Sequence, residues 1–141
     1  MLFSLEHPLS EPSAAIPRIL VLVAEDEELI LDLIEAVLED GGFDVRRVLD
    51  GAEAIAALDS GHSDIGAVVT DIRLGAGPSG WDIARHARQL RPDIPVVFMS
   101  GDSAADWTAH GVPNSLMISK PFAPAQIVTA VAQLLNHPPA V

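Results

Sequence analysis

The chain has 141 residues, 49% of them hydrophobic, and its 20 acidic and 8 basic residues give a net charge of −12. This composition indicates one folded domain with a hydrophobic core. The sequence has no cysteine, which excludes disulfides, thiolate metal sites and cysteine nucleophiles. It also lacks the basic cluster that direct DNA binding needs and the apolar run of about 20 residues that spans a membrane. We therefore expect a cytoplasmic protein that binds neither DNA nor membrane.

The first 17 residues contain three prolines and no regular hydrophobic period, so they predict a flexible N-terminal arm. A buried strand is predicted over residues 18–24, because apolar residues follow one another without interruption. Four carboxylates come directly after it, at residues 25–28. Apolar residues then recur at helical spacing, which predicts a helix from Glu27 or Glu28 to the Gly41–Gly42 pair.

The rest of the chain repeats this order of strand and helix. Further strands are predicted at residues 43–48, 65–70, 94–99 and 115–118. The helices after them are predicted at residues 51–61, 79–90, 103–110 and 124–137. Five strand–helix units in strict alternation are typical of a parallel sheet with helices on both faces. We assign residues 18–137 to this single α/β domain and residues 138–141 to a C-terminal tail.

Polar side chains stand where four of the predicted strands end. The first strand is followed by Glu25 and Asp26, the third by Asp71, the fourth by Ser100 and the fifth by Lys120. Parallel strands bring their carboxyl ends to one edge of the sheet, so these side chains are expected to converge. Several carboxylates in one place need a cation, and oxygen ligands favour Mg²⁺. An aspartate beside a metal and a lysine can accept a phosphoryl group as an acyl phosphate.

Each feature also has an ordinary structural explanation. Acidic residues are favoured at the start of any helix, and an aspartate commonly ends a strand at a turn. A single lysine or serine in a loop carries no functional signal. Their joint placement at one sheet edge favours the functional interpretation.

Four motifs resemble the receiver domain of bacterial two-component response regulators. They are the run Ile19–Glu27, the strand-terminal Asp71, Ser100–Gly101 and Lys120–Phe122, in matching order over about residues 18–136. The resemblance implies the doubly wound, flavodoxin-like (βα)5 receiver fold, with a five-stranded parallel sheet in the order 2-1-3-4-5. It also implies a cis peptide bond between Lys120 and Pro121.

The resemblance further implies roles for individual residues. Asp71 would accept a phosphoryl group from a histidine kinase or a histidine phosphotransfer protein. Ser100 would donate a hydrogen bond to the phosphoryl group, and Lys120 would pair with it.

A magnesium site is implied at the same place. Asp26 would bind Mg²⁺ directly together with the phosphoacceptor Asp71, and Glu25 would take part through water. The backbone carbonyl of Arg73 would complete the protein ligands.

The expected function is therefore a single-domain response regulator whose phosphorylation switches partner binding. It would catalyse only its own aspartyl phosphorylation and dephosphorylation. The kinase would dock near the first helix, where we expect Leu31, Asp32 and Glu35 to be exposed. A downstream protein would bind the predicted fourth and fifth helices, at residues 103–110 and 124–137.

Two alternatives remain open at this point. Met117 stands three residues before Lys120, where the family often has a Tyr or Phe that rotates on activation. A degenerate receiver that binds partners without phosphorylation is therefore a second possibility. A phosphatase of the haloacid-dehalogenase type is disfavoured, since it needs a second aspartate where this chain has Arg73.

Trp107, in the predicted helix at 103–110, is either a partner anchor or a core residue.

Overall fold

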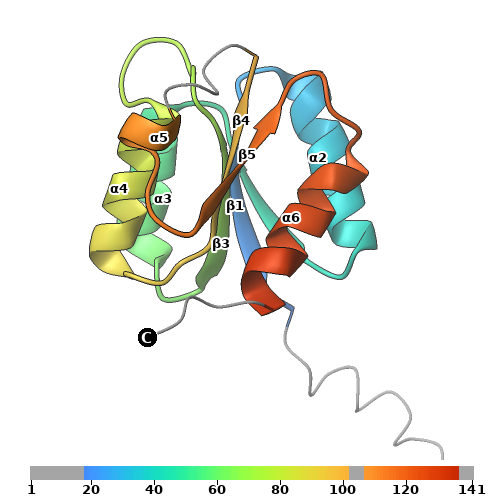
Figure 1. The fold of residues 1–141 in the computed structure, drawn as a ribbon. Coiled ribbons are helices and arrows are strands. Elements are labelled where there is room, and N and C mark those ends of the chain that lie inside the picture. Colours follow the sequence, from blue (N-terminus) through green and yellow to red (C-terminus); the bar gives the residue numbers. More distant parts are fainter. Residues whose placement is uncertain (1–17, 102–106, 137–141) are drawn as a thin grey trace, which may run out of the picture.

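The computed structural model of the protein describes residues 18–101 and 107–136. They form a parallel sheet between two layers of helices (Figure 1). The predicted N-terminal arm, the C-terminal tail and the start of the predicted helix at 103–110 lie outside the described residues. No helix in the described ranges has the length and apolar character that crossing a membrane requires.

Each predicted strand and helix corresponds to an element of the described chain, the helix predicted at 103–110 only from residue 107 onward. The strands are β1 (Leu20–Ala24), β2 (Asp44–Val48), β3 (Ile65–Asp71), β4 (Val96–Ser100) and β5 (Ser115–Ser119). The helices are α2 (Glu28–Asp40), α3 (Gly51–Gly61), α4 (Gly80–Leu90), α5 (Trp107–His110) and α6 (Ala125–Asn136). Every neighbouring pair of strands is parallel, in the order β2-β1-β3-β4-β5. The predicted fold class and strand order are confirmed.

The sheet divides the hydrophobic core into two halves. Helices α3, α4 and α5 cover one face, and α2 and α6 cover the other (Figure 1). Strand β4 shows the alternation: Val96 and Phe98 point into the first half, while Val97 and Met99 point into the second. Because both faces are covered, the central strands are apolar along their whole length. The polar residues that end them are therefore confined to the edge of the sheet.

Local caps fix where the helices begin. The side chain of Asp50 accepts a hydrogen bond of 2.8 Å from the backbone N–H of Glu53, so Asp50 is the N-cap of α3. At α4, Ser79 and Asp82 form a capping box in which each side chain accepts from the other residue's backbone N–H. This capping box ends the loop after β3, so it also determines where that loop returns to the sheet.

Helix α2 corrects one prediction. Leu31 is fully buried together with Ile34 and Leu38, so the prediction of an exposed Leu31 is wrong. The exposed leucines are instead Leu29 and Leu33, with 80% and 55% of their surface accessible. Apolar residues occur on several sides of this helix, so hydrophobic spacing alone does not identify the buried face.

The two acidic residues predicted to be exposed on α2 face strand β2. Arg47 forms ion pairs with Asp32 at 2.8 Å and with Glu35 at 2.5 Å. Asp32 is exposed as predicted, whereas Glu35 is half-buried. This side of α2 is thus occupied by intramolecular ion pairs.

We expect Leu38→Ala to lower the free energy of unfolding by about 2–5 kcal/mol, because it leaves a cavity in the packed core. Leu29→Ala on the same helix is the matched control and should change stability by less than about 0.5 kcal/mol. Urea unfolding followed by circular dichroism measures both. Equal losses would contradict the assignment of the buried face of α2.

Candidate functional site

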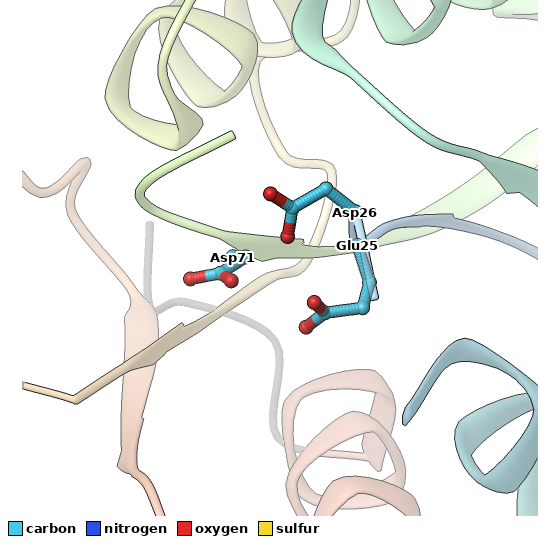
Figure 2. Close-up of side chains that lie close together, drawn as sticks. All are labelled: Glu25, Asp26 and Asp71. Atoms are coloured by element: carbon cyan, nitrogen blue, oxygen red, sulfur yellow. The ribbon is translucent and has the colours of Figure 1, made fainter. Parts of the chain in front are cut away.

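Three carboxylates meet at the carboxyl edge of the sheet. Glu25 and Asp26 follow β1, and Asp71 is the last residue of β3. Each offers a carboxylate oxygen, and these oxygens all lie within 4.8 Å of one another (Figure 2). Glu25 and Asp71 are buried, while Asp26 is exposed. The predicted convergence of these three residues is present in the structure.

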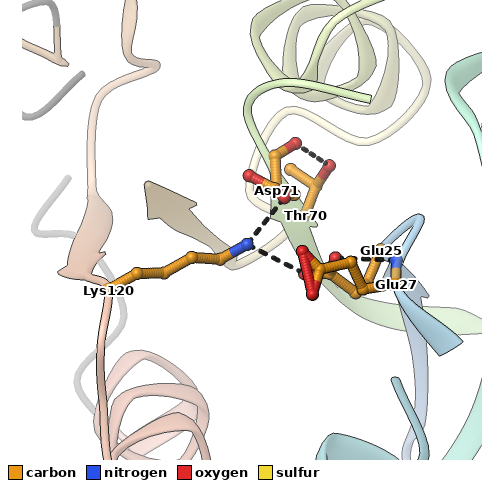
Figure 3. Close-up of polar contacts among 5 residues, drawn as sticks. All are labelled: Glu25, Glu27, Thr70, Asp71 and Lys120. Carbon is orange, nitrogen blue, oxygen red and sulfur yellow. Dashed lines mark hydrogen bonds and ion pairs between the residues drawn. The ribbon is translucent and has the colours of Figure 1, made fainter. Parts of the chain in front are cut away.

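Lys120 reaches this cluster from the end of β5. Its Nζ donates to Asp71 Oδ2 at 2.8 Å and to Glu25 Oε1 at 3.2 Å (Figure 3). Its backbone N–H donates to the carbonyl oxygen of Ser100 at 2.7 Å, so the ends of β4 and β5 are held together. The Lys120–Pro121 peptide bond is cis, as predicted.

Glu25 is the most deeply buried member of the cluster, with no accessible surface. Burial raises the pKa of its carboxyl to about 7, and the nearby Asp71 carboxylate adds to this rise. The backbone N–H of Glu27, which donates to Glu25 Oε2 at 3.0 Å, and the Lys120 ammonium act in the opposite direction. Two hydrogen bonds therefore hold a carboxylate from which water is excluded.

The environment of Lys120 keeps its side chain protonated. Burial by itself lowers the pKa of the ammonium, but hydrogen bonds and charges from Asp71 and Glu25 outweigh it, so the pKa is raised overall. Lys120 is thus a fixed positive charge between two carboxylates.

The charges of the site suit a divalent cation. Three carboxylates face one ammonium group, so their ionised forms leave a surplus of negative charge. A set of carboxylate oxygens with one exposed member fits a hard cation such as Mg²⁺, which keeps part of its water shell. Ser100 is buried at the end of β4, and Arg73 is exposed in the loop after β3. The role of the Arg73 carbonyl stays a prediction.

Two residues beside Asp71 were not identified from the sequence. Thr70 is fully buried, and its Oγ1 donates to the carbonyl oxygen of Asp71 at 2.8 Å. Gly80 packs against the same carbonyl, which a Cβ atom at position 80 would overlap. Neither residue belongs to a recognisable motif, because both act through contacts that only the folded chain creates.

A family match accounts for this arrangement. Residues 21–132, which are more than half of the chain, match the response regulator receiver domain. The chain belongs to this family.

Individual relatives agree with the assignment of a receiver domain. A response regulator receiver protein from Sinorhizobium medicae WSM419 is 47% identical, with a TM-score of 0.81, over 84% of this chain and 95% of that one. The response regulator SaeR of Staphylococcus aureus (strain USA300) is 27% identical over 119 residues, which are 83% of this chain and 50% of SaeR. The chain thus spans about half the length of the curated relatives it matches.

A more distant structure shares the receiver fold. It is the receiver domain of the sensor histidine kinase PA1611 from Pseudomonas aeruginosa PAO1, with a TM-score of 0.73 and 21% identity over 86% of this chain and all of that one. That crystal structure has a magnesium ion coordinated in its active-site cleft.

We expect Gly80→Ala to destabilise this receiver domain by about 1–3 kcal/mol, because the added methyl group forces the Asp71 backbone to move. Gly101→Ala is the control, since a Cβ atom there meets no heavy atom within 4 Å. Thermal unfolding measures both variants. A Gly80→Ala protein as stable as the control would contradict the close contact between α4 and Asp71.

Proposed function

We propose that this receiver domain is a phosphoacceptor in a two-component pathway, phosphorylated on Asp71 with the help of Mg²⁺. One observation carries the proposal: Lys120 bonds to Asp71 Oδ2 at 2.8 Å, within a cluster of three carboxylates. This arrangement sets a nucleophilic oxygen beside one fixed positive charge and a set of metal ligands.

The transfer step begins with a phosphohistidine on the donor protein. A carboxylate oxygen of Asp71 attacks the phosphorus atom, the P–N bond of the donor breaks, and its electron pair stays on the imidazole nitrogen. The product is an acyl phosphate on Asp71. The acyl phosphate is later hydrolysed. Water attacks the phosphorus atom, the bond from phosphorus to the Asp71 oxygen breaks, and inorganic phosphate leaves as the carboxylate is restored. The chain catalyses only these changes to itself.

The surrounding residues stabilise the phosphoryl oxygens. Lys120 pairs with one of them after leaving the carboxylate of Asp71, and the hydroxyl of Ser100 donates a hydrogen bond to another. The metal would be held by Asp26 and Asp71, through water by Glu25, and by the backbone carbonyl of Arg73. When bound, Mg²⁺ offsets negative charge on the phosphoryl group.

The donor protein needs a surface next to Asp71, and an apolar groove lies there. It has a volume of about 410 Å³ and is lined by Ile30, Leu33, Lys120, Pro121, Phe122 and Pro124. Lys120 belongs both to this groove and to the phosphoacceptor site. Leu33, which lines the groove, is 55% exposed and so is accessible to a partner. We place the histidine donor on this groove.

The downstream protein is proposed to bind α5 and α6, which flank β5. The earlier expectation of a single-domain protein stays a prediction, because the curated relatives are about twice as long as the matched region.

Incubation with acetyl phosphate and Mg²⁺ should add one phosphoryl group to the wild-type chain, as measured by intact mass. Asp71→Asn should remove the labelling because it removes the nucleophile, and a chelator should remove it from the wild type. Asp26→Asn should raise the Mg²⁺ concentration for half-maximal labelling about tenfold or more, since one charged ligand is lost. An unlabelled wild type, beside a second receiver that is labelled, would favour the degenerate binding module.

The variant Leu33→Asn tests whether the histidine donor binds the apolar groove. We expect phosphotransfer from a histidine kinase that labels the wild type to slow about tenfold, because an apolar contact of the interface is lost. Labelling by acetyl phosphate should be unchanged, since a small donor needs no docking surface. Ile19→Asn is the control, as Ile19 is 38% exposed just before β1, at the opposite edge of the sheet. Equal transfer rates for the two variants would contradict this placement of the donor.

A further inference from the structure

The start of α4 is held against the backbone of the phosphoacceptor. The backbone N–H of Gly80 donates to the carbonyl oxygen of Ile72 at 2.9 Å. A side chain at position 80 would overlap the carbonyl of Asp71. A movement of the Asp71–Ile72 backbone is therefore passed directly to the first residues of α4.

Trp81 follows Gly80 and connects this point to α5. Its ring lies 4.7 Å from the ring of Phe98 on β4 and 5.9 Å from the ring of His110 on α5, measured between centroids. In the described ranges, the two ring–ring contacts both involve Trp81. One half-buried side chain thus contacts a strand of the site and a helix at the surface.

Met117 occupies the place where related receivers often carry the rotating aromatic ring. It is half-buried and pairs in register with Phe98, so the two side chains share one face of the sheet. An unbranched methionine adapts its shape to its surroundings and transmits a displacement poorly. Phe98 and Trp81 place rigid rings on this same face, in contact with each other.

Trp107, the second tryptophan, is held by different contacts. Trp107 is half-buried against the same core, and its Nε1–H donates to the hydroxyl of Ser115 at 3.0 Å. This contact ties α5 to the start of β5. The structure therefore favours the core-packing interpretation of Trp107 over that of a partner anchor.

We propose that Trp81 couples the phosphorylation state of Asp71 to the position of α5, in the role that an aromatic residue at position 117 has elsewhere. This inference rests on the proposed function of Asp71. A shift of the Asp71–Ile72 backbone moves Gly80, and the Trp81 ring transfers the movement to His110. Packed rings favour discrete arrangements over gradual deformation, which suits them to a two-state switch. Trp81 is a positioning residue and takes no part in the transfer itself.

The test compares labelling of Asp71 with the response of α5. Beryllium fluoride with Mg²⁺ serves as a stable phosphoryl mimic, and ¹H–¹⁵N spectra report on the indole of Trp81 and on the amides of His110 and Gly111. Trp107→Phe assigns the two indole signals. In the wild type, we expect the mimic to shift all three signals. In Trp81→Leu, labelling by acetyl phosphate should persist, while the shifts at His110 and Gly111 fall about fivefold or more.

Two further variants separate coupling from loss of packing. Leu90 packs against the same core from the far end of α4, so Leu90→Ala should weaken stability and leave the α5 response intact. Trp81→Phe keeps a ring and should restore most of the response. A full α5 response in a labelled Trp81→Leu protein overturns the coupling, as does a labelled wild type in which α5 does not respond. A wild type that acetyl phosphate does not label overturns the proposed function itself.

Discussion

The site depends on one half-buried ammonium group between two buried carboxylates. Glu25 and Asp71 are almost completely removed from water, and Lys120 provides a hydrogen bond and a positive charge to each. Burying two carboxylates side by side without such a partner is strongly unfavourable. Lys120 comes from the last strand, whereas the carboxylates come from the first and third. The site is therefore complete only when β1, β3, β4 and β5 lie side by side in this order.

The same burial also affects the electrostatics of the site. Burial removes the water that would solvate the Glu25 carboxylate, and this raises the pKa of Glu25 to about 7, with a further contribution from the charge of Asp71. The folded chain thus gathers negative charge at one edge of the sheet, which a divalent cation would offset. Arg47 and its two carboxylate partners lie on the surface, where such pairs contribute little to stability. The buried charges are thus concentrated at the site, while the pairs of Arg47 lie nearer the surface.

The sequence was sufficient to predict the fold and the convergence of three carboxylates with Lys120 at the edge of the sheet. Uninterrupted apolar strands must be covered on both faces, and a polar residue can follow them only at the edge, so Asp71 and Lys120 were identifiable. The buried face of α2 was not, because Leu29, Leu31 and Leu33 are equally apolar and only the packed sheet distinguishes them. Nor did any pattern separate buried Glu25 from exposed Asp26, which are neighbours after the same strand. The contact of Gly80 with Asp71 depends on how the intervening loop closes.

The division of the core into two halves has a consequence for the order of events. The apolar groove proposed for the histidine donor lies where α2 meets the segment after β5. Trp81 and α5 lie on the opposite face of the sheet. A donor seated on one face leaves the other face uncovered. Helix α6, however, lies on the same face as the groove. A downstream protein that binds both α5 and α6, as proposed, would therefore reach around the sheet and share the α6 side with the donor. The donor would then have to leave this side before the downstream protein covers it.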